Sequence, residues 1–144
     1  MENLRVDEKI QAHYMVSIHT MSIGAPMENN EAIKNRVLDY VEGWYEGNGA
    51  RMERALSPHL AKRRVVSNEE IWDVSKDWMV EATGNGQGRL DEPEKGIKEI
   101  TILDQTETIA SVKLVSNKFV DYLHLVKTNG DWVIVNALWD YIPK

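Results

Sequence analysis

The sequence predicts an α+β domain, because helical periodicity fills its first half and strand alternation fills its second. Over residues 30–83, apolar side chains recur at the three- and four-residue spacing of amphipathic helices. From about residue 98 onward, four segments of alternating apolar and polar residues are separated by short polar turns. A run of helices followed by antiparallel strands favours helices packed on one face of a curved sheet.

The composition is that of one globular domain, and it excludes several classes of protein. The 144 residues include 17 Lys and Arg against 23 Asp and Glu, which gives a net charge of −6. This acidic balance argues against nucleic acid as a partner. The chain has no cysteine, so disulfides and thiolate metal sites are excluded. No apolar run is long enough to cross a membrane and the N-terminus lacks a signal peptide, so we expect a cytoplasmic protein without membrane contact.

The N-terminal residues and the first helix differ sharply in periodicity. Residues 1–29 carry little pattern and are expected to form an arm, a short strand or an extension before a domain of residues 30–144. An amphipathic helix is then predicted to begin with Asn30 as its N-cap and to end at Gly47 and Gly49. Its apolar stripe consists of Ile33, Val37, Tyr40, Val41 and Trp44.

Two further helices are predicted before the strands. A short helix over residues 50–56 is ended by a Ser-Pro pair, and residues 59–66 are expected to be extended. A capping box formed by Ser67 and Glu70 then predicts a third helix over residues 67–83. The following glycine-rich loop comes after a helix and before coil, so it is not a phosphate-binding loop and is expected to be a flexible loop or pocket lid.

The C-terminal part is predicted to be a β-meander. The last two strands are apolar on both faces, which is unusual in a small domain unless a partner covers the second face. We therefore expect a homodimer formed through the sheet. The four strands are predicted over residues 98–104, 108–116, 119–128 and 132–142.

Three segments carry a resemblance to a known superfamily. "AIKNRVLDYVEGWYEGN", "ALSPHLAKR" and above all "FVDYLHLVKTNGDWVIVNALW" resemble the nuclear-transport-factor-2-like superfamily, and within it the lumazine-binding branch. The resemblance covers about residues 30–143. It implies a cone-shaped roll in which three N-terminal helices pack on a strongly curved, mostly antiparallel sheet, with a pocket between them and dimerisation through the sheet. Ser57 stands where the branch commonly has a histidine, and His59 follows two residues later.

Tyr40 and Asp121 are the main candidates for chemistry. Their sequence contexts resemble those of the two oxyanion donors of ketosteroid isomerase, a tyrosine and a protonated aspartic acid. Alternatively, Tyr40 is a core tyrosine with a local partner, and Asp121 is a structural carboxylate that caps a turn or pairs with a lysine. His124 is a candidate proton shuttle, or a structural or interface histidine.

A basic run occupies the position at which the isomerase carries its carboxylate base. Here the chain has Lys62, Arg63 and Arg64, so Arg63 is a candidate anion clamp, or the run is a solvated strand edge. Trp44 and Trp139 are the tryptophans expected near a ligand. No histidine or carboxylate spacing suits a metal, so we expect neither a metal nor a cofactor.

The direction in which Asp121 points depends on the turn at residues 129–130. A three-residue loop with Gly130 as a bulge pairs Leu125 with Val133, and it places Asp121 beside Ala137 and Trp139; this is the preferred register. A two-residue turn instead pairs Leu125 with Ile134. If the inner face also changed under that register, Tyr122, His124 and Trp139 would line the pocket.

These observations favour a small-molecule-binding domain with a mostly apolar pocket, and they name no ligand. One alternative is an isomerase, dehydratase or cyclase that acts next to a carbonyl, with Tyr40 and Asp121 as donors and His124 as proton shuttle. Another is a dimerisation or assembly domain whose pocket is filled by its own side chains.

Overall fold

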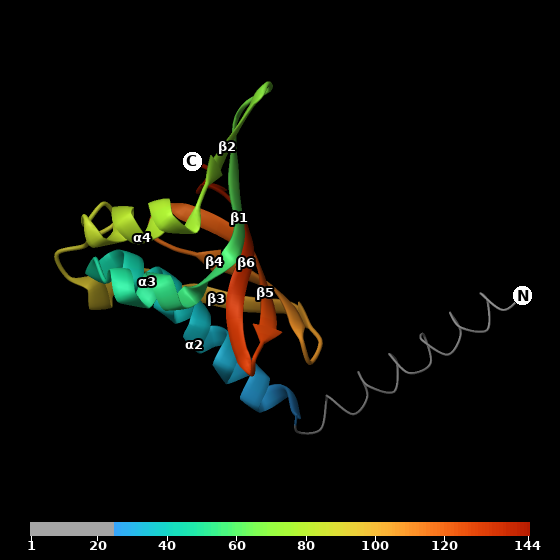
Figure 1. The fold of residues 1–144 in the computed structure, drawn as a ribbon. Helices are drawn as coiled ribbons and strands as arrows, with labels where there is room; N and C mark the ends of the chain where they lie inside the picture. Colours follow the sequence, from blue (N-terminus) through green and yellow to red (C-terminus); the bar gives the residue numbers. More distant parts are fainter. Residues whose placement is uncertain (1–24) are drawn as a thin grey trace, which may run out of the picture. The chain divides into compact units, whose positions relative to one another are not determined.

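Three helices lie on one side of a curved six-stranded sheet in the computed structural model (Figure 1). The structure describes residues 25–144, and residues 32–144 form one compact unit; the predicted N-terminal segment lies almost wholly outside the described residues. The strand order is β2-β1-β6-β5-β4-β3, and all pairs are antiparallel except β1 with β6. This confirms the predicted α+β class. The elements are α2 (Ala25–Glu46), α3 (Gly49–Ala55), β1 (Leu56–Ser67), β2 (Glu70–Val74), α4 (Lys76–Gly84), the 3-10 helix η1 (Pro93–Lys95), β3 (Glu99–Gln105), β4 (Ile109–Val115), β5 (Phe119–Thr128) and β6 (Asp131–Tyr141).

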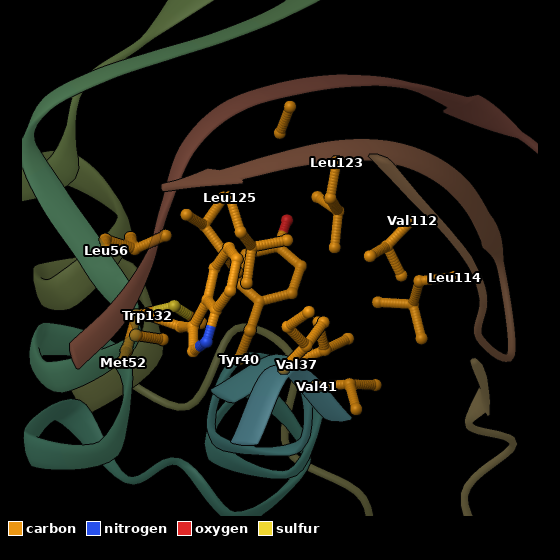
Figure 2. Close-up of a cluster of buried hydrophobic side chains, with 14 of the residues drawn as sticks. Val37, Tyr40, Val41, Met52, Leu56, Val112, Leu114, Leu123, Leu125 and Trp132 are labelled. Carbon is orange, nitrogen blue, oxygen red and sulfur yellow. The ribbon is translucent and has the colours of Figure 1, made fainter. Parts of the chain in front are cut away.

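Helix α2 places the predicted apolar stripe against the sheet. It begins at Ala25, so Asn30 lies inside the helix and the predicted N-cap is wrong. It ends as predicted, because Gly47 adopts a φ of +67° that favours glycine. Ile33 and Val37 are completely buried, while Trp44 is only partly buried. Figure 2 shows Val37, Tyr40 and Val41 pointing from the helix toward side chains of the strands.

The predicted third helix is wrong in its first half. Residues 67–74 form the turn and second strand of a β-hairpin, in which the Ser67 hydroxyl accepts a hydrogen bond from the Glu69 amide instead of capping a helix. Helix α4 begins only after Ser75, whose hydroxyl accepts a hydrogen bond from the Trp78 amide. A serine side chain can accept hydrogen bonds from the same backbone amides in a helix cap and in a tight turn. The spacing of Ser67 and Glu70 alone therefore does not distinguish a helix start from a hairpin turn.

The turn between β5 and β6 corrects the predicted register. It is a two-residue turn, with Asn129 and Gly130 both at positive φ, and it pairs Leu125 with Ile134. The preferred three-residue loop is therefore wrong. A bulge at Val135 then shifts the register by one residue and brings Asp121 opposite Trp139. Asp121 thus keeps its expected aromatic neighbour, although the bulge lies inside β6 and not at the turn.

The hydrophobic core lies between α2 and the inner face of the sheet. Figure 2 shows the inward side chains of β4 and β5 meeting those of α2. None of the helices in the described part of the chain is both long and apolar enough to cross a membrane. The largest fully buried apolar side chains are Ile33, Met52, Leu56, Leu114, Leu123, Leu125, Ile134, Val37 and Val112.

Candidate functional site

A cavity of about 180 Å³ opens between the helices and the inner face of the sheet. It is smaller than the roughly 300–1,000 Å³ of pockets that hold drug-sized ligands, so it suits a compact ring compound. The loop after α4 also reaches it, through Gln87. Aromatic side chains form much of its wall: Tyr40, Trp44, Trp72, Trp78, Phe119, Trp139 and Tyr141.

Three polar side chains meet in the wall of this aromatic cavity. The ammonium of Lys62 donates a hydrogen bond to the hydroxyl of Tyr40, and that hydroxyl donates to the carboxylate of Asp121 at 3.0 Å. Their exposed fractions are only 8% for Lys62, 6% for Tyr40 and 4% for Asp121. The chain therefore buries a cation and an anion that are joined through one neutral hydroxyl.

Burial changes the proton affinity of each member of this group. Desolvation raises the pKa of the Asp121 carboxyl above 3.8, although Lys62 and the Tyr40 hydrogen bond oppose this effect. Desolvation also lowers the pKa of Lys62 below 10.5, although the charge of Asp121 opposes it. The pKa of Tyr40 is raised well above 10.0 by burial and by the neighbouring carboxylate. Tyr40 therefore stays neutral, while both charged groups are driven toward their neutral forms.

Two ring faces surround the Lys62 amine. Its Nζ atom lies 5.0 Å from the centroid of the Tyr40 ring and 5.5 Å from that of Trp139. Such contacts stabilise a cation through the negative faces of the rings. The indole N–H of Trp139 is also buried, and it has no hydrogen-bond partner within residues 25–144.

The aromatic wall continues toward solvent. Trp72 packs edge-on against Trp78 at 5.6 Å between ring centroids and against Trp139 at 6.0 Å, and the two outer tryptophans are 41% and 39% exposed. Arg64 lies over the rings of Tyr141 and Trp139, and its Nε atom donates to Asp140. Partly exposed aromatic side chains therefore form part of the cavity wall.

Strand alternation explains which predicted residues reach the cavity. Tyr40, Asp121, Trp44 and Trp139 all line it. Arg63 does not, because neighbouring residues of a strand point to opposite faces. Its guanidinium instead contacts the Asp73 carboxylate at 2.7 Å, while Lys62 is the member of the basic run that lines the cavity.

Tyr122 and His124 alternate along β5 with buried side chains and are exposed on the outer face of the sheet. There Nδ1 of His124 lies 3.3 Å from the Asn136 amide nitrogen, so His124 cannot reach the Tyr40 hydroxyl. We define this outer face by Arg63, Lys113, Tyr122, His124 and Leu138, which the strand pairing places side by side. Ser57 is buried and His59 is exposed, and neither lines the cavity. Within the described residues, no group of three or more His, Asp or Glu side chains is placed to hold a metal ion.

Comparison with known proteins connects this geometry to a fold. A nuclear-transport-factor-2-like protein of unknown function from Silicibacter pomeroyi DSS-3 is 18% identical, with a TM-score of 0.69 over 81% of this chain and 98% of that chain. A protein with a cystatin-like fold from Nostoc punctiforme is 10% identical, with a TM-score of 0.60 over 80% of this chain and 92% of that chain. A ketosteroid isomerase-like protein from Erwinia carotovora atroseptica is 11% identical, with a TM-score of 0.58 over 79% and 96%. At these identities the likeness shows the fold alone, which is nuclear-transport-factor-2-like, as the sequence predicts.

No curated protein matches the chain. The family model described as "Putative lumazine-binding" matches residues 28–140, from the fourth residue of α2 to the penultimate residue of β6. That match spans both sides of the cavity and more than half of the chain. The chain therefore belongs to the "Putative lumazine-binding" family, and its fold is nuclear-transport-factor-2-like.

Proposed function

We propose that this protein binds a compact ring compound that places one oxygen at Lys62, Tyr40 and Asp121. The observation that carries the proposal is the buried polar group in the wall of a cavity that is otherwise mostly apolar. Pockets for small molecules typically combine apolar walls with a few placed polar groups that orient the ligand. The ammonium of Lys62 favours an oxygen with negative or partial negative charge.

The chain does not need this polar group to fill its core. A buried ion pair is often no more stabilising than apolar residues of the same volume, because both charges lose their hydration. The cavity also leaves space beside the polar group, whereas an assembly domain of the kind considered above fills it with its own side chains. Both observations favour a ligand over a purely structural role.

The direct test is to titrate the protein with toluene, 4-methylphenol and benzoate, following tryptophan fluorescence and the melting temperature. The oxygen-bearing rings are expected to bind more tightly than toluene, and to raise the melting temperature by mass action. Tyr40→Phe and Lys62→Met should remove this preference, while Tyr122→Phe on the outer face should keep it. If none of the three compounds shifts the melting temperature of the unmodified protein, the proposal is wrong.

A second candidate function is an isomerase, dehydratase or cyclase that acts next to a carbonyl. The observation that favours it is the raised pKa of Asp121, because a protonated carboxyl can donate a hydrogen bond to a developing oxyanion. Tyr40 would be the second donor. The titratable amine next to the Tyr40 hydroxyl is that of Lys62, and His124 does not reach this hydroxyl. Deuterium exchange next to the carbonyl of 1-indanone, followed by NMR, tests this candidate. The exchange catalysed by the protein should be lost in Asp121→Asn.

We also propose that two copies pair through the outer face of the sheet. Tyr122 and Leu138 are direct cross-strand neighbours there, with exposed fractions of 46% and 51%. The same face carries Lys113 and Arg63 beside these apolar side chains. An apolar centre bordered by charges suits a symmetric contact in which each copy uses the same surface.

A further inference from the structure

We propose that the amine of Lys62 forms a Schiff base with an aromatic aldehyde or ketone bound in the cavity. This inference rests on the ligand-binding function proposed above, and it adds the chemical class of the ligand and a covalent mode of binding. It is carried by the position of the Lys62 amine, which borders a largely aromatic cavity and is hydrogen-bonded to a neutral hydroxyl.

The environment of Lys62 differs from that of other lysines in the chain. Lys98 holds its ammonium 2.7 Å from the Glu42 carboxylate, and Lys76 lies 3.2 Å from Glu53. In both cases a carboxylate is the direct partner of the ammonium. The hydrogen-bond partner of Lys62 is instead the Tyr40 hydroxyl, and aromatic rings surround its Nζ atom. The ring faces favour the cation, but Lys62 is only 8% exposed and has no direct carboxylate contact, and this desolvation favours the neutral, nucleophilic amine.

Asp121 is the group that accepts a proton from Lys62 before the reaction. A proton that leaves Lys62 for Asp121 can pass through Tyr40, since the hydroxyl accepts from the amine and donates to the carboxylate. The result is a neutral amine and a carboxylic acid, with no change in the net charge of the group. Desolvation makes this transfer easier, because it lowers the pKa of Lys62 and raises that of Asp121.

The covalent step balances with these groups alone. The amine lone pair of Lys62 forms a bond to the carbonyl carbon while the C–O π electrons move to oxygen, and a proton moves from nitrogen to that oxygen through the Tyr40 hydroxyl. The carbinolamine oxygen then takes the proton of the Asp121 carboxyl and leaves as water. The nitrogen lone pair forms the C=N bond, so the products are a protonated imine, a carboxylate and one water molecule. The imine cation remains beside the negative charge of Asp121.

The aromatic wall selects the rest of the ligand. Trp44, Phe119 and Trp139 present ring surfaces to the cavity, against which a flat aryl group can stack or pack edge-on. The volume of about 180 Å³ favours a one-ring or two-ring compound. Aryl aldehydes and ketones combine such a ring with an electrophilic carbon next to it.

Reductive trapping tests the inference. The full chain is incubated with benzaldehyde and sodium cyanoborohydride, which reduces an imine to a stable amine, and the product is digested and analysed by mass spectrometry. We expect one benzyl group on Lys62, with at least about tenfold more label there than on Lys118, which is exposed in the turn between β4 and β5, because burial of Lys62 favours its neutral amine. Equal labelling of Lys62 and Lys118 would overturn the inference.

Benzyl alcohol separates the covalent step from binding, because it has the same ring without the electrophilic carbon. If benzyl alcohol and benzaldehyde both shift tryptophan fluorescence but Lys62 is not labelled preferentially, the Schiff base is wrong and the ligand-binding proposal stands. If neither compound binds and no preferential label forms, both proposals fail.

Two variants locate the reactive amine. Lys62→Arg keeps a cation but cannot form an imine, and it should lose the label while Lys118→Arg, in the exposed turn between β4 and β5, keeps it. A Lys62→Arg variant that still gains one benzyl group as fast as the unmodified protein would contradict the inference. If Lys62→Arg does not fold, the peptide map of the unmodified protein decides alone.

Discussion

Lys62 and Asp121 are a buried cation and a buried anion that do not touch each other directly but share the hydroxyl of Tyr40. They come from different strands, β1 and β5, which are separated in the sheet by β6. Tyr40 reaches them from α2, so the helix supplies the group that connects the two charges. This arrangement makes the three side chains one energetic unit, and substitutions in it are expected to be strongly non-additive.

The first prediction concerns the free energy of unfolding of Lys62 and Asp121 variants. Lys62→Met leaves a buried carboxyl without its cation, and Asp121→Asn leaves a buried ammonium without its anion. Each single variant should lose about 3–5 kcal/mol near neutral pH, reduced where the remaining group can become neutral. The double variant should lose less than the sum of the two, because it leaves no unpaired charge. Urea unfolding measures all four proteins.

The pH dependence of Lys62→Met provides a further check. Without the cation, the raised pKa of Asp121 means that the folded state holds a proton that the unfolded state has released. The stability of Lys62→Met should therefore fall as the pH rises above 3.8, and it should level off once the pH has passed the folded pKa of Asp121. Lys118→Met, in the exposed turn between β4 and β5, is the matched control and should show no such added slope. If the losses of stability in Lys62→Met and Asp121→Asn simply add in the double variant, the two groups are energetically independent and the first prediction is wrong.

The meeting of Tyr40 and Asp121 is easier to predict from the sequence than the role of Lys62. Tyr40 belongs to a helical stripe whose spacing is unambiguous, and Asp121 interrupts an apolar strand. Lys62 is one of three consecutive basic residues, and alternation alone does not say which face of the strand is buried. Lysine and arginine are both almost never fully buried, so burial preference does not separate Lys62 from Arg63. The buried face of β1 becomes clear only once its pairing with β6 is known.

The errors in the fold also have local causes. Ser67 and Glu70 match a capping box, but the same residues close the hairpin between β1 and β2. The strand pairing that decides between these outcomes involves residues far apart in the sequence. The bulge at Val135 carries no glycine or proline that would mark it, so only the paired strands reveal it. The strands of the meander were predictable because each is bounded by polar turns.

The second prediction concerns Gly88, which lies against the ring of Trp44 in the loop after α4. A Cβ atom added at Gly88 would lie 2.1 Å from atoms of that ring, so Gly88→Ala must displace Trp44 or the loop. Overpacking of this kind costs about 1–3 kcal/mol. Because Trp44 lines the cavity, ligand affinity should fall together with the melting temperature. Gly84→Ala is the matched control, since its Cβ would meet nothing within 4 Å, and a Gly88→Ala protein as stable as that control would contradict the prediction.

The third prediction tests the proposed pairing of two copies through the outer face. Leu138→Lys would place a charge at the centre of that face, and burying an unpaired charge opposes association. Sedimentation equilibrium should find a dimer for the unmodified protein and a monomer for this variant at the same concentration. Ile97→Lys, at an exposed apolar residue in the loop after η1, should remain a dimer. A monomeric unmodified protein at high concentration would remove the basis of this proposal.

The last prediction concerns Asp39, whose carboxylate connects α2 to α3. It accepts hydrogen bonds from Arg36 and Arg51 at 3.0 Å and from Arg54 at 2.8 Å, and it is 8% exposed. Burial on its own raises the pKa of Asp39, but the hydrogen bonds of Arg54 and Arg51 and their charges outweigh burial and lower it below 3.8. The unfolded state therefore binds a proton before the folded state does as the pH falls.

Asp39→Asn should lower the free energy of unfolding by about 2 kcal/mol near neutral pH, where the carboxylate is ionised in both states. The stabilising contribution of the ionised Asp39 carboxylate is present above pH 3.8 and is lost as the pH falls through the lower pKa of Asp39 in the folded state. The difference between the unmodified protein and Asp39→Asn should consequently shrink in acid, as urea unfolding at a series of pH values will measure. Asp73→Asn, which breaks the exposed contact with Arg63, should change stability little at any pH. The prediction is wrong if this difference in the free energy of unfolding stays constant from neutral pH to acid. The size and shape of the Asp39 side chain, and not its charge, would then account for the loss of stability.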